Sequence, residues 1–182
     1  VLPLDVTDDA FYAPLVLGSP EVARMMLRNP DASAAFAMFR RVSVALLVAH
    51  PGHELRVHGW VERERPLVYV LTDGSGHRGE ARTESTRRLV AAAGARPGPV
   101  FGRVPDVELY RALLRGDHRP FVELFEEIAD SVAREGVRVL AAGAAEGFNP
   151  AHDAARLLAN AVVGRSARGG LPVENLAFPL EA

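Results

Sequence analysis

Three histidines stand where their imidazole rings could converge on one metal ion. His50 and His53 lie three residues apart in the segment His-Pro-Gly-His-Glu, which directly follows an apolar run, and His152 follows a later apolar run. Imidazole is a common zinc ligand, and three protein ligands leave one coordination position open, as catalytic zinc sites do. The three histidines therefore indicate a catalytic metal site. The alternative is that each is an ordinary hydrogen-bonded loop residue.

Acidic residues on the histidine loops, and one that closes the second strand, are candidates for proton transfer or for orienting the rings. These residues are Glu54, Asp73, Glu146 and Asp153. A positioned carboxylate can act as a general base, but it can equally hold an imidazole N–H or cap the following helix. We rank Glu54 first and Asp73 second as the base, because Glu54 lies on the loop that carries two of the histidines. We expect Asp153 to orient a histidine or to cap the last helix. The other histidines, His58, His77 and His118, show no such convergence.

The elements that must position these residues follow from the hydrophobic pattern. Short apolar runs rich in β-branched residues predict buried strands at 42–49, 67–71 and 137–142, each followed by a loop of polar or small residues. Apolar residues at helical spacing predict helices at 83–93, 106–114 and 120–135. Strands that alternate with helices indicate an α/β fold with an open, mostly parallel sheet flanked by helices. Ligands of such sheets bind beyond the carboxyl ends of the strands, where all three histidines are expected.

Composition narrows the range of functions. The chain has 182 residues, 48% of them hydrophobic, which is enough for one ordinary domain with its own core. It has no cysteine, so any metal must be bound by His, Asp or Glu. A formal net charge of −2 argues against a nucleic-acid partner and favours a small-molecule substrate. The apolar runs are too short to span a membrane and the amino terminus is acidic, so we expect a cytoplasmic protein with no membrane partner.

Residues 1–41 differ in pattern from the rest of the chain. Ser-Pro-Glu at 19–21 is typical of a helix start, and a second helix is predicted after Asp31. We therefore expect a helical N-terminal extension over residues 1–41, followed by the α/β domain over residues 42–182. The apolar side chains of the extension predict packing on the α/β core or on a second copy of the chain, which would make a homo-oligomer.

Four short motifs, in order along the chain, resemble those of the PIG-L/LmbE-like N-acetylglucosaminyl deacetylases. They are Ala-His-Pro-x-x-Glu at 49–54, Thr-Asp-Gly at 72–74, an Arg and a Glu at the start of the next helix, and x-Pro-x-His at 149–152. The resemblance covers roughly residues 43–165. It implies a Rossmann-like fold and a zinc-dependent hydrolase that removes an acetyl group from an amino sugar. It also implies that His50 and His152 are zinc ligands, and that His53 replaces the usual aspartate ligand.

This chain departs from the family pattern at two positions. Gly52 stands where the family has the aspartate thought to act as general base, and Asn149 stands where it has a histidine that assists proton transfer or oxyanion stabilisation. Asparagine can still donate a hydrogen bond to an oxyanion, whereas glycine cannot act as a base. Another carboxylate would therefore have to accept the proton, for which Glu54 and Asp73 are the candidates.

Substrate contacts are expected from Arg78, Arg82 and Glu146. The two arginines follow the glycine-rich turn at 74–76, and their forked donors suit sugar hydroxyls or a phosphate. The alternative for Arg82 is a surface ion pair with Glu80 or Glu84.

The sequence therefore favours a zinc-dependent amide hydrolase, with an N-deacetylase of an amino sugar or related conjugate as the leading interpretation. One alternative is a metal- or sugar-binding protein of the same fold that lost its base with Gly52. Another is a metal enzyme that catalyses a different reaction in a biosynthetic pathway. Restoring the carboxylate with Gly52→Asp should raise hydrolysis only if the protein is a weakened deacetylase.

Overall fold

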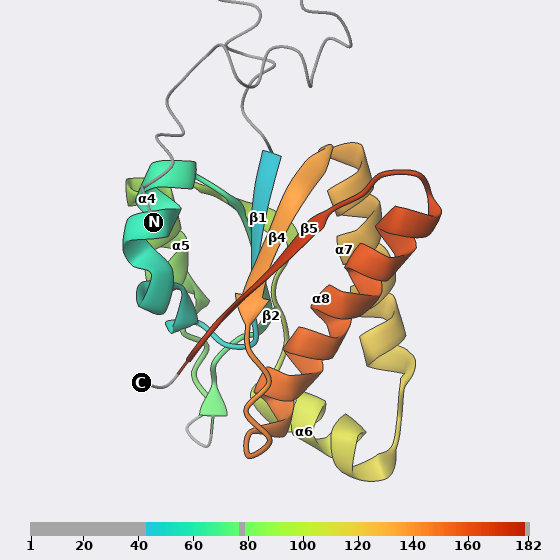
Figure 1. Cartoon of the computed structure of the whole chain (residues 1–182). Coiled ribbons are helices and arrows are strands. Elements are labelled where there is room, and N and C mark those ends of the chain that lie inside the picture. The colour runs from blue at the N-terminus through green and yellow to red at the C-terminus, as the bar shows by residue number, and fades with distance from the viewer. Residues whose placement is uncertain (1–42, 77–78, 181–182) are drawn as a thin grey trace, which may run out of the picture. The chain divides into compact units, whose positions relative to one another are not determined.

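The parallel sheet is the element that positions every candidate residue. The computed structural model describes residues 43–76 and 79–180, so the helices predicted within residues 1–41 lie outside the described residues. Its strands are β1 (Ser43–Val48), β2 (Leu67–Thr72), β3 (Arg96–Val104), β4 (Val137–Gly143) and β5 (Glu174–Phe178). They pair in the order β3-β2-β1-β4-β5, and every pairing is parallel (Figure 1). The predicted α/β fold with an open parallel sheet is confirmed.

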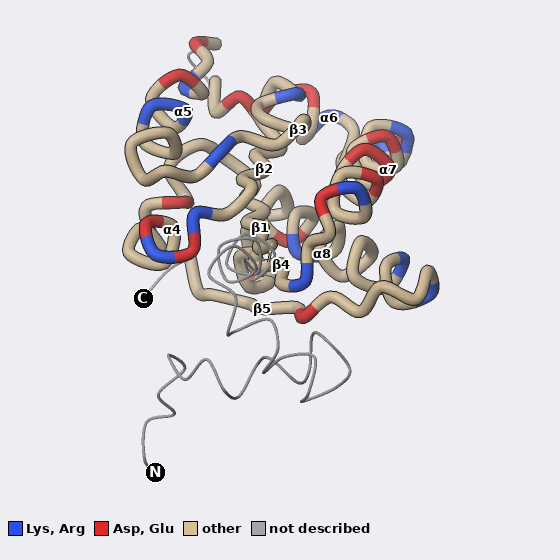
Figure 2. Tube along the Cα trace, turned by 90° about the horizontal axis from the view of Figure 1, so that it is seen from above, with Lys and Arg blue, Asp and Glu red and all other residues tan. Residues whose placement is uncertain are grey.

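Helices cover both faces of this sheet. A 3₁₀ turn η1 (His53–Val57), α4 (His58–Glu64) and α5 (Thr83–Ala92) lie on one side, and α7 (Arg119–Arg134) and α8 (Pro150–Arg168) lie on the other, with α6 (Asp106–Arg115) near the carboxyl ends of the strands (Figure 1). Charged residues lie mainly along the helices, while β1 carries none (Figure 2). None of the described helices is long and apolar enough to cross a membrane.

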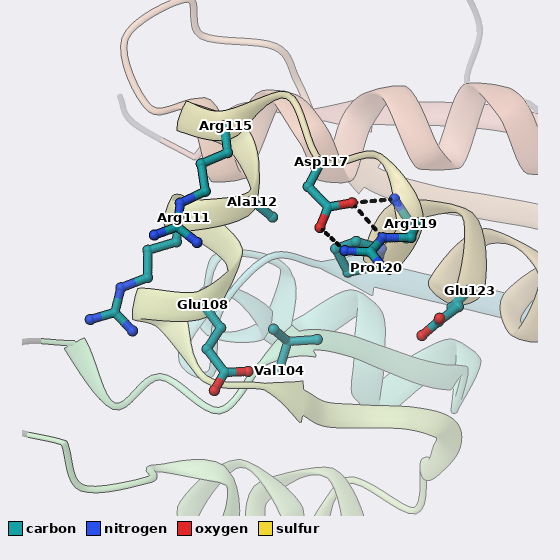
Figure 3. Close-up of a pocket in the computed structure, with 9 residues that line it drawn as sticks. All are labelled: Val104, Glu108, Arg111, Ala112, Arg115, Asp117, Arg119, Pro120 and Glu123. Atoms are coloured by element: carbon teal, nitrogen blue, oxygen red, sulfur yellow. Dashed lines mark hydrogen bonds and ion pairs between the residues drawn. The ribbon is translucent and has the colours of Figure 1, made fainter.

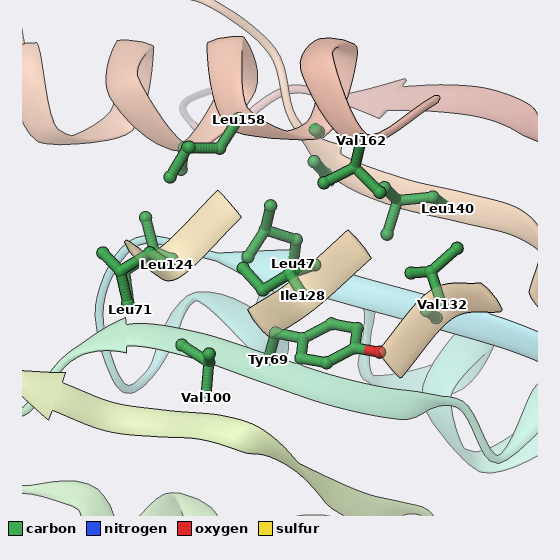
Figure 4. Packing of buried hydrophobic residues seen from close by; sticks show 14 of the residues in the cluster. Leu47, Tyr69, Leu71, Val100, Leu124, Ile128, Val132, Leu140, Leu158 and Val162 are labelled. Atoms are coloured by element: carbon green, nitrogen blue, oxygen red, sulfur yellow. The ribbon is translucent and has the colours of Figure 1, made fainter. Parts of the chain in front are cut away.

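The core is split by the sheet into two layers, because successive side chains of a strand point to opposite faces. Leu47 and Tyr69 belong to the larger cluster, which packs against α7 and α8 through residues such as Ile128 and Val162 (Figure 4). The neighbouring strand residues Leu46, Val48, Val68 and Val70 belong to the second cluster, which packs against α4 and α5. Burial on both faces explains why β1 and β2 are continuous apolar runs rather than alternating ones.

The order of the strands places the loop after β1 and the loop after β4 side by side, at the carboxyl ends of these strands. The chain continues from β1 toward β2 on one side of the sheet, and β4 lies on the other side of β1, with Leu47 opposite Ala142. The carboxyl ends of β1 and β4 therefore flank the point where the strand order changes direction, which is the usual ligand position in open α/β sheets. His50 follows β1 and His152 follows β4, so this topology brings together residues that are distant in sequence.

Candidate metal centre

The three predicted histidines converge in the structure. The ring centroids of His50 and His53 are 5.3 Å apart, those of His50 and His152 are 5.4 Å apart, and those of His53 and His152 are 4.5 Å apart. The sequence interpretation of three neighbouring imidazoles is thus matched by the geometry. His58 instead lies 3.5 Å from Glu62 on the exposed side of α4, and the exposed His118 precedes α7. His77 lies outside the described residues.

His50 is held by a buried carboxylate and a hydroxyl. Its Nδ1 lies 2.9 Å from Asp106 Oδ1 and 2.7 Å from Thr72 Oγ1. The Thr72 hydroxyl donates to the Ala49 carbonyl at 3.1 Å, so both oxygens can accept from the His50 Nδ1–H. This network assigns the proton to Nδ1 and leaves the lone pair of Nε2 available, as in carboxylate–histidine–metal sites.

His152 is oriented in a similar way from the other loop. Its Nδ1 donates to Glu146 Oε2 at 2.6 Å, and both side chains are at least nine-tenths buried. The ring lies in the first turn of α8, where Asn149 caps the helix by accepting from the amides of Ala151 and His152, and Pro150 occupies the first helical position. Asp153 accepts from the amides of Glu146 and Gly147, which fixes the loop that carries Glu146. A carboxylate therefore backs this ring too.

His53 differs from the other two rings, because no carboxylate of the described residues binds it. It begins η1, directly after Gly52, whose φ of +103° lies in the left-handed region. Its Nδ1 is buried and has no hydrogen-bond partner among the described residues. His58 Nδ1 and Glu146 Oε1 are also buried without a partner among the described residues, so this feature does not by itself mark a ligand position.

The surroundings of His53 and His50 lower the pKa of each ring and so favour its neutral form. Burial, together with the neighbouring His152 and His50 rings and the arginines Arg82 and Arg56, lowers the pKa of His53 to about 3. Burial also lowers the pKa of His50, and this effect outweighs the opposite effect of Asp106. Neutral imidazole is the form that binds a metal, so His50 and His53 are in the ligand form at neutral pH.

The residues present fit zinc in type and in spacing. Three imidazoles on one tetrahedral ion, with Zn–N distances of about 2.0–2.1 Å, would have centroids about 5 Å apart. Among the described residues, however, no group of three or more His, Asp or Glu side chains could hold a metal ion in its present arrangement. One reason is visible at His152, whose Nε2 lies 3.0 Å from Asn149 Nδ2 and accepts from it. Binding at all three rings therefore requires this amide to give way.

The candidate bases differ in how their oxygens are used. Glu54 is buried, and its two oxygens accept from the Gly52 amide at 2.8 Å and the Thr86 hydroxyl at 2.9 Å. It therefore braces the loop that carries His53, which is the alternative role considered for it. Asp73 accepts from the Ser75 amide at 2.9 Å through Oδ1. Its Oδ2 makes no hydrogen bond within the described part of the chain, which leaves that oxygen open for proton transfer.

The expected substrate contacts are placed unevenly. Arg82 is exposed and its Nε donates to the Gly74 carbonyl at 2.6 Å, which holds the guanidinium beside the turn after β2. It forms no ion pair with Glu80 or Glu84 within the described residues, and Glu84 lies 3.9 Å from Arg88 instead. Arg78 lies outside the described residues. Glu146 faces His152, so its position suits ring orientation better than the substrate contact expected from the sequence.

Three residues at the centre were missed by sequence reasoning. Asp106 and Thr72 bind His50, and the hydroxyl of Tyr110 donates to Asn149 Oδ1 at 3.1 Å. Asp106 also accepts from the Gly76 amide at 2.7 Å. Burial raises the pKa of Asp106, but the nearby Thr72 hydroxyl, the hydrogen bond from the Gly76 amide and the nearby His50 together lower it by more, so the net shift is downward and the carboxylate stays ionised. For Asp106 the sequence offered one signal: in Val-Pro-Asp at 104–106, an acidic residue begins a predicted helix directly after an apolar segment.

One surface cavity lies apart from the three histidines. It has a volume of about 530 Å³ and is bordered by α6 and the start of α7 (Figure 3). Arg119 pairs with Asp117 there, and no histidine lines it. The lining has as many acidic as arginine side chains: Glu108, Asp117 and Glu123 against Arg111, Arg115 and Arg119. The described lining therefore offers a ligand no net charge.

Comparison with known proteins adds no assignment. No protein-family model matches the chain, and a search of curated proteins finds no match.

Proposed function

We propose that His50, His53 and His152 bind one zinc ion, and that the protein is a zinc-dependent amide hydrolase, most plausibly an N-deacetylase of an amino sugar or related conjugate. The observation that carries the proposal is the convergence of three imidazole rings, 4.5–5.4 Å apart, at the carboxyl edge of the sheet. The motifs that resemble the PIG-L/LmbE-like deacetylases support the reaction type.

Zinc bound there would polarise an acyl oxygen and activate water for attack. The protein's own groups would orient the substrate and move protons. Once the Asn149 amide releases His152 Nε2 to the metal, its N–H groups could donate to the acyl oxygen as negative charge develops. Arg82, fixed through Nε, keeps its terminal N–H groups for a substrate oxygen.

Asp73 is the better candidate of the two for the general base, because both oxygens of Glu54 already accept hydrogen bonds. Asp73 is linked to the ligands through Asp106, whose amide donates to Asp73 Oδ1 at 3.3 Å and whose carboxylate holds His50. This assignment reverses the ranking expected from the sequence and is itself a proposal.

One observation favours a binding protein instead. Gly52 occupies the position of the family's aspartate, and the remaining carboxylate of that loop, Glu54, is committed to bracing it. A protein with this loop could keep the metal and lose turnover. Zinc content and hydrolysis must therefore be measured separately.

The test compares purified wild type with His50→Ala, His152→Ala and the control His118→Ala, whose histidine is exposed and outside the cluster. Metal analysis should find about one zinc per chain in wild type and His118→Ala and none in the other two. Zinc should stay bound near pH 6 and dissociate only as the pH falls toward about 3, because the lowered pKa of His53 keeps its imidazole neutral above that range and protonated imidazole does not bind metal.

Amine release from N-acetylglucosamine conjugates is then measured per bound zinc. Turnover in wild type and His118→Ala supports the hydrolase, while bound zinc without turnover on any acetylated amino sugar supports the binding protein. A protein that cannot be loaded with zinc, or that loads equally well without His50, contradicts the metal site itself.

A further inference from the structure

The Asn149 side chain occupies the nitrogen of His152 that a metal would need. Its Nδ2 lies 3.0 Å from His152 Nε2, and the Nδ1 of the same ring donates to Glu146 Oε2 at 2.6 Å. With the proton on Nδ1, the Nε2 lone pair can only accept, so this contact is a hydrogen bond from the Asn149 amide. Nε2 is also the nitrogen of this ring that is left for a metal. The amide and an ion therefore compete for one lone pair.

Three donors fix the orientation of the Asn149 amide. Its Oδ1 accepts from the backbone amides of Ala151 and His152, at 3.1 and 3.4 Å, and from the Tyr110 hydroxyl at 3.1 Å. These contacts identify Oδ1 as the acceptor and so place Nδ2, which is a donor, toward the His152 ring. Asn149 is the N-cap of α8, so the bonds that begin this helix also hold the amide against the ring.

Zinc and the amide cannot share this position. A zinc ion binds an imidazole nitrogen at about 2.0–2.1 Å along its lone pair, and the amide nitrogen already lies 3.0 Å from His152 Nε2. The ion would overlap Nδ2 unless the Asn149 side chain turned away. Turning it breaks the bond to His152 and disturbs the bonds of Oδ1 to the start of α8 and to Tyr110.

We infer that Asn149, held by Tyr110, is a latch that competes with zinc for His152 and so sets the metal affinity of the site. The inference rests on the proposed zinc site but not on the proposed reaction. The free energy needed to open the latch is subtracted from that of zinc binding, because only the open form offers all three rings. Opening also frees the amide N–H groups that the proposed function assigns to the acyl oxygen.

The test removes the amide while keeping the start of the helix. In Asn149→Ser, serine caps a helix about as well as asparagine and has no amide to bind the ring. Zinc affinity, measured by chelator competition, should tighten about tenfold, because opening the latch costs about one helix cap and one hydrogen bond. Asn160→Ser is the matched control on α8, since Asn160 is exposed and binds Arg156 and Asn175 rather than a histidine. It should leave zinc affinity within about twofold of wild type.

Two further variants separate the latch from other effects. Tyr110→Phe removes one of the donors that hold Oδ1 and should tighten zinc binding about two- to fivefold with the helix cap intact. Asn149→Asp keeps the cap but adds a carboxylate beside the ring, so tighter zinc binding in this variant alone would reflect the added charge. That outcome overturns the inference, as does unchanged zinc affinity in Tyr110→Phe. A loss of stability in Asn149→Ser with unchanged zinc affinity would show that Asn149 is only a helix cap.

A second readout follows the latch itself in the full-length wild type. Without zinc, one amide proton of Asn149 is bound to His152, so zinc saturation should shift the ¹H–¹⁵N signal of this side chain and speed its exchange with water. A signal unchanged by bound zinc overturns the inference and leaves the metal site intact. Absence of zinc binding from wild type and every variant overturns both. Bound zinc with an open latch but without turnover supports the inference and contradicts only the proposed reaction.

Discussion

Gly52→Asp is the substitution that probes the proposed chemistry most directly, because it restores a carboxylate on the loop between His50 and His53. The backbone at Gly52 has φ +103° and ψ −18°, a region that side chains rarely adopt. A Cβ built there meets no heavy atom within 4 Å, so the cost is backbone strain rather than a clash. For a non-glycine residue in the left-handed region that strain is about 1–2 kcal/mol.

The backbone strain at position 52 predicts a modest loss of stability, and a control variant must carry the same strain. The free energy of unfolding should fall by about 1–2 kcal/mol, which corresponds to about 2–8 °C in Tm for a chain of this size. Gly52→Ala carries the same backbone strain without a carboxylate, so it should lose a similar amount. Any difference between the two variants in turnover then reflects the carboxylate alone.

The assay is amine release from acetylated amino sugars, normalised to zinc content, in wild type and both variants. If the protein is a hydrolase limited by its missing base, Gly52→Asp should raise kcat about 10²–10⁴-fold over Gly52→Ala, the usual contribution of a positioned general base. Equal turnover in the two variants, with zinc retained, would refute the idea that turnover is limited by the missing carboxylate at position 52, and is the result expected if Asp73 already acts as the base. Loss of zinc only in Gly52→Asp would show that the carboxylate disturbs the rings.

Three substitutions and one pH titration test the roles assigned around the centre. Asp106→Asn removes the charge that backs His50, so zinc affinity measured by chelator competition should fall about 10–100-fold with the fold intact. Glu54→Gln should mainly lower stability, by about 1–3 kcal/mol in denaturant titration, whereas Asp73→Asn should lower turnover per zinc about 10²–10⁴-fold. Without metal, stability should fall as the pH drops from about 6.5 toward 3, because unfolded His53 gains a proton near its ordinary pKa while the folded residue, with its pKa lowered to about 3, does not. The slope from this residue is at most about 1.4 kcal/mol per pH unit.

Controls keep these outcomes distinct. Asp130→Asn removes an exposed carboxylate that pairs with Arg165 and should leave zinc affinity unchanged. If Asp106→Asn behaves like Asp130→Asn, then Asp106 does not position His50. A collapse of turnover in Glu54→Gln with normal turnover in Asp73→Asn would return the base role to Glu54. A pH profile of stability unchanged by His53→Asn would contradict the role given to His53.

The sequence predicted the central strands but not the edges of the sheet. Strands β1, β2 and β4 are apolar runs because helices cover both of their faces, and burial of that kind leaves a plain signal. Strand β3 begins Arg-Pro-Gly-Pro, which reads as a turn, yet proline is tolerated on an edge strand such as this one. Strand β5 is exposed over most of its length and so shows no burial pattern. Edge strands depend on pairing partners that local patterns do not reveal.

The same limit applies to the candidate centre. The three histidines were predictable because each directly follows a recognisable strand or opens the helix after it. Asp106 was not assigned to the site, because its contact with His50 spans 56 residues of sequence and depends on the end of β3 reaching the end of β1. The role of Glu54 was also undecidable from spacing, since Thr86, one of its two partners, lies on α5.

The three rings of the centre come together only when β1 pairs with β4, as in the native topology. An unfolded chain presents His50 and His53 close together, but His152 joins them only after strands far apart in sequence have found their register. Contacts of such long separation form late and carry a large loop-closure cost. An ion that needs all three rings therefore binds the folded chain far better than the unfolded one, and stabilises it by RT ln(1 + [ion]/Kd). If zinc binds as proposed, its affinity and the resistance of the protein to unfolding would be linked measurements.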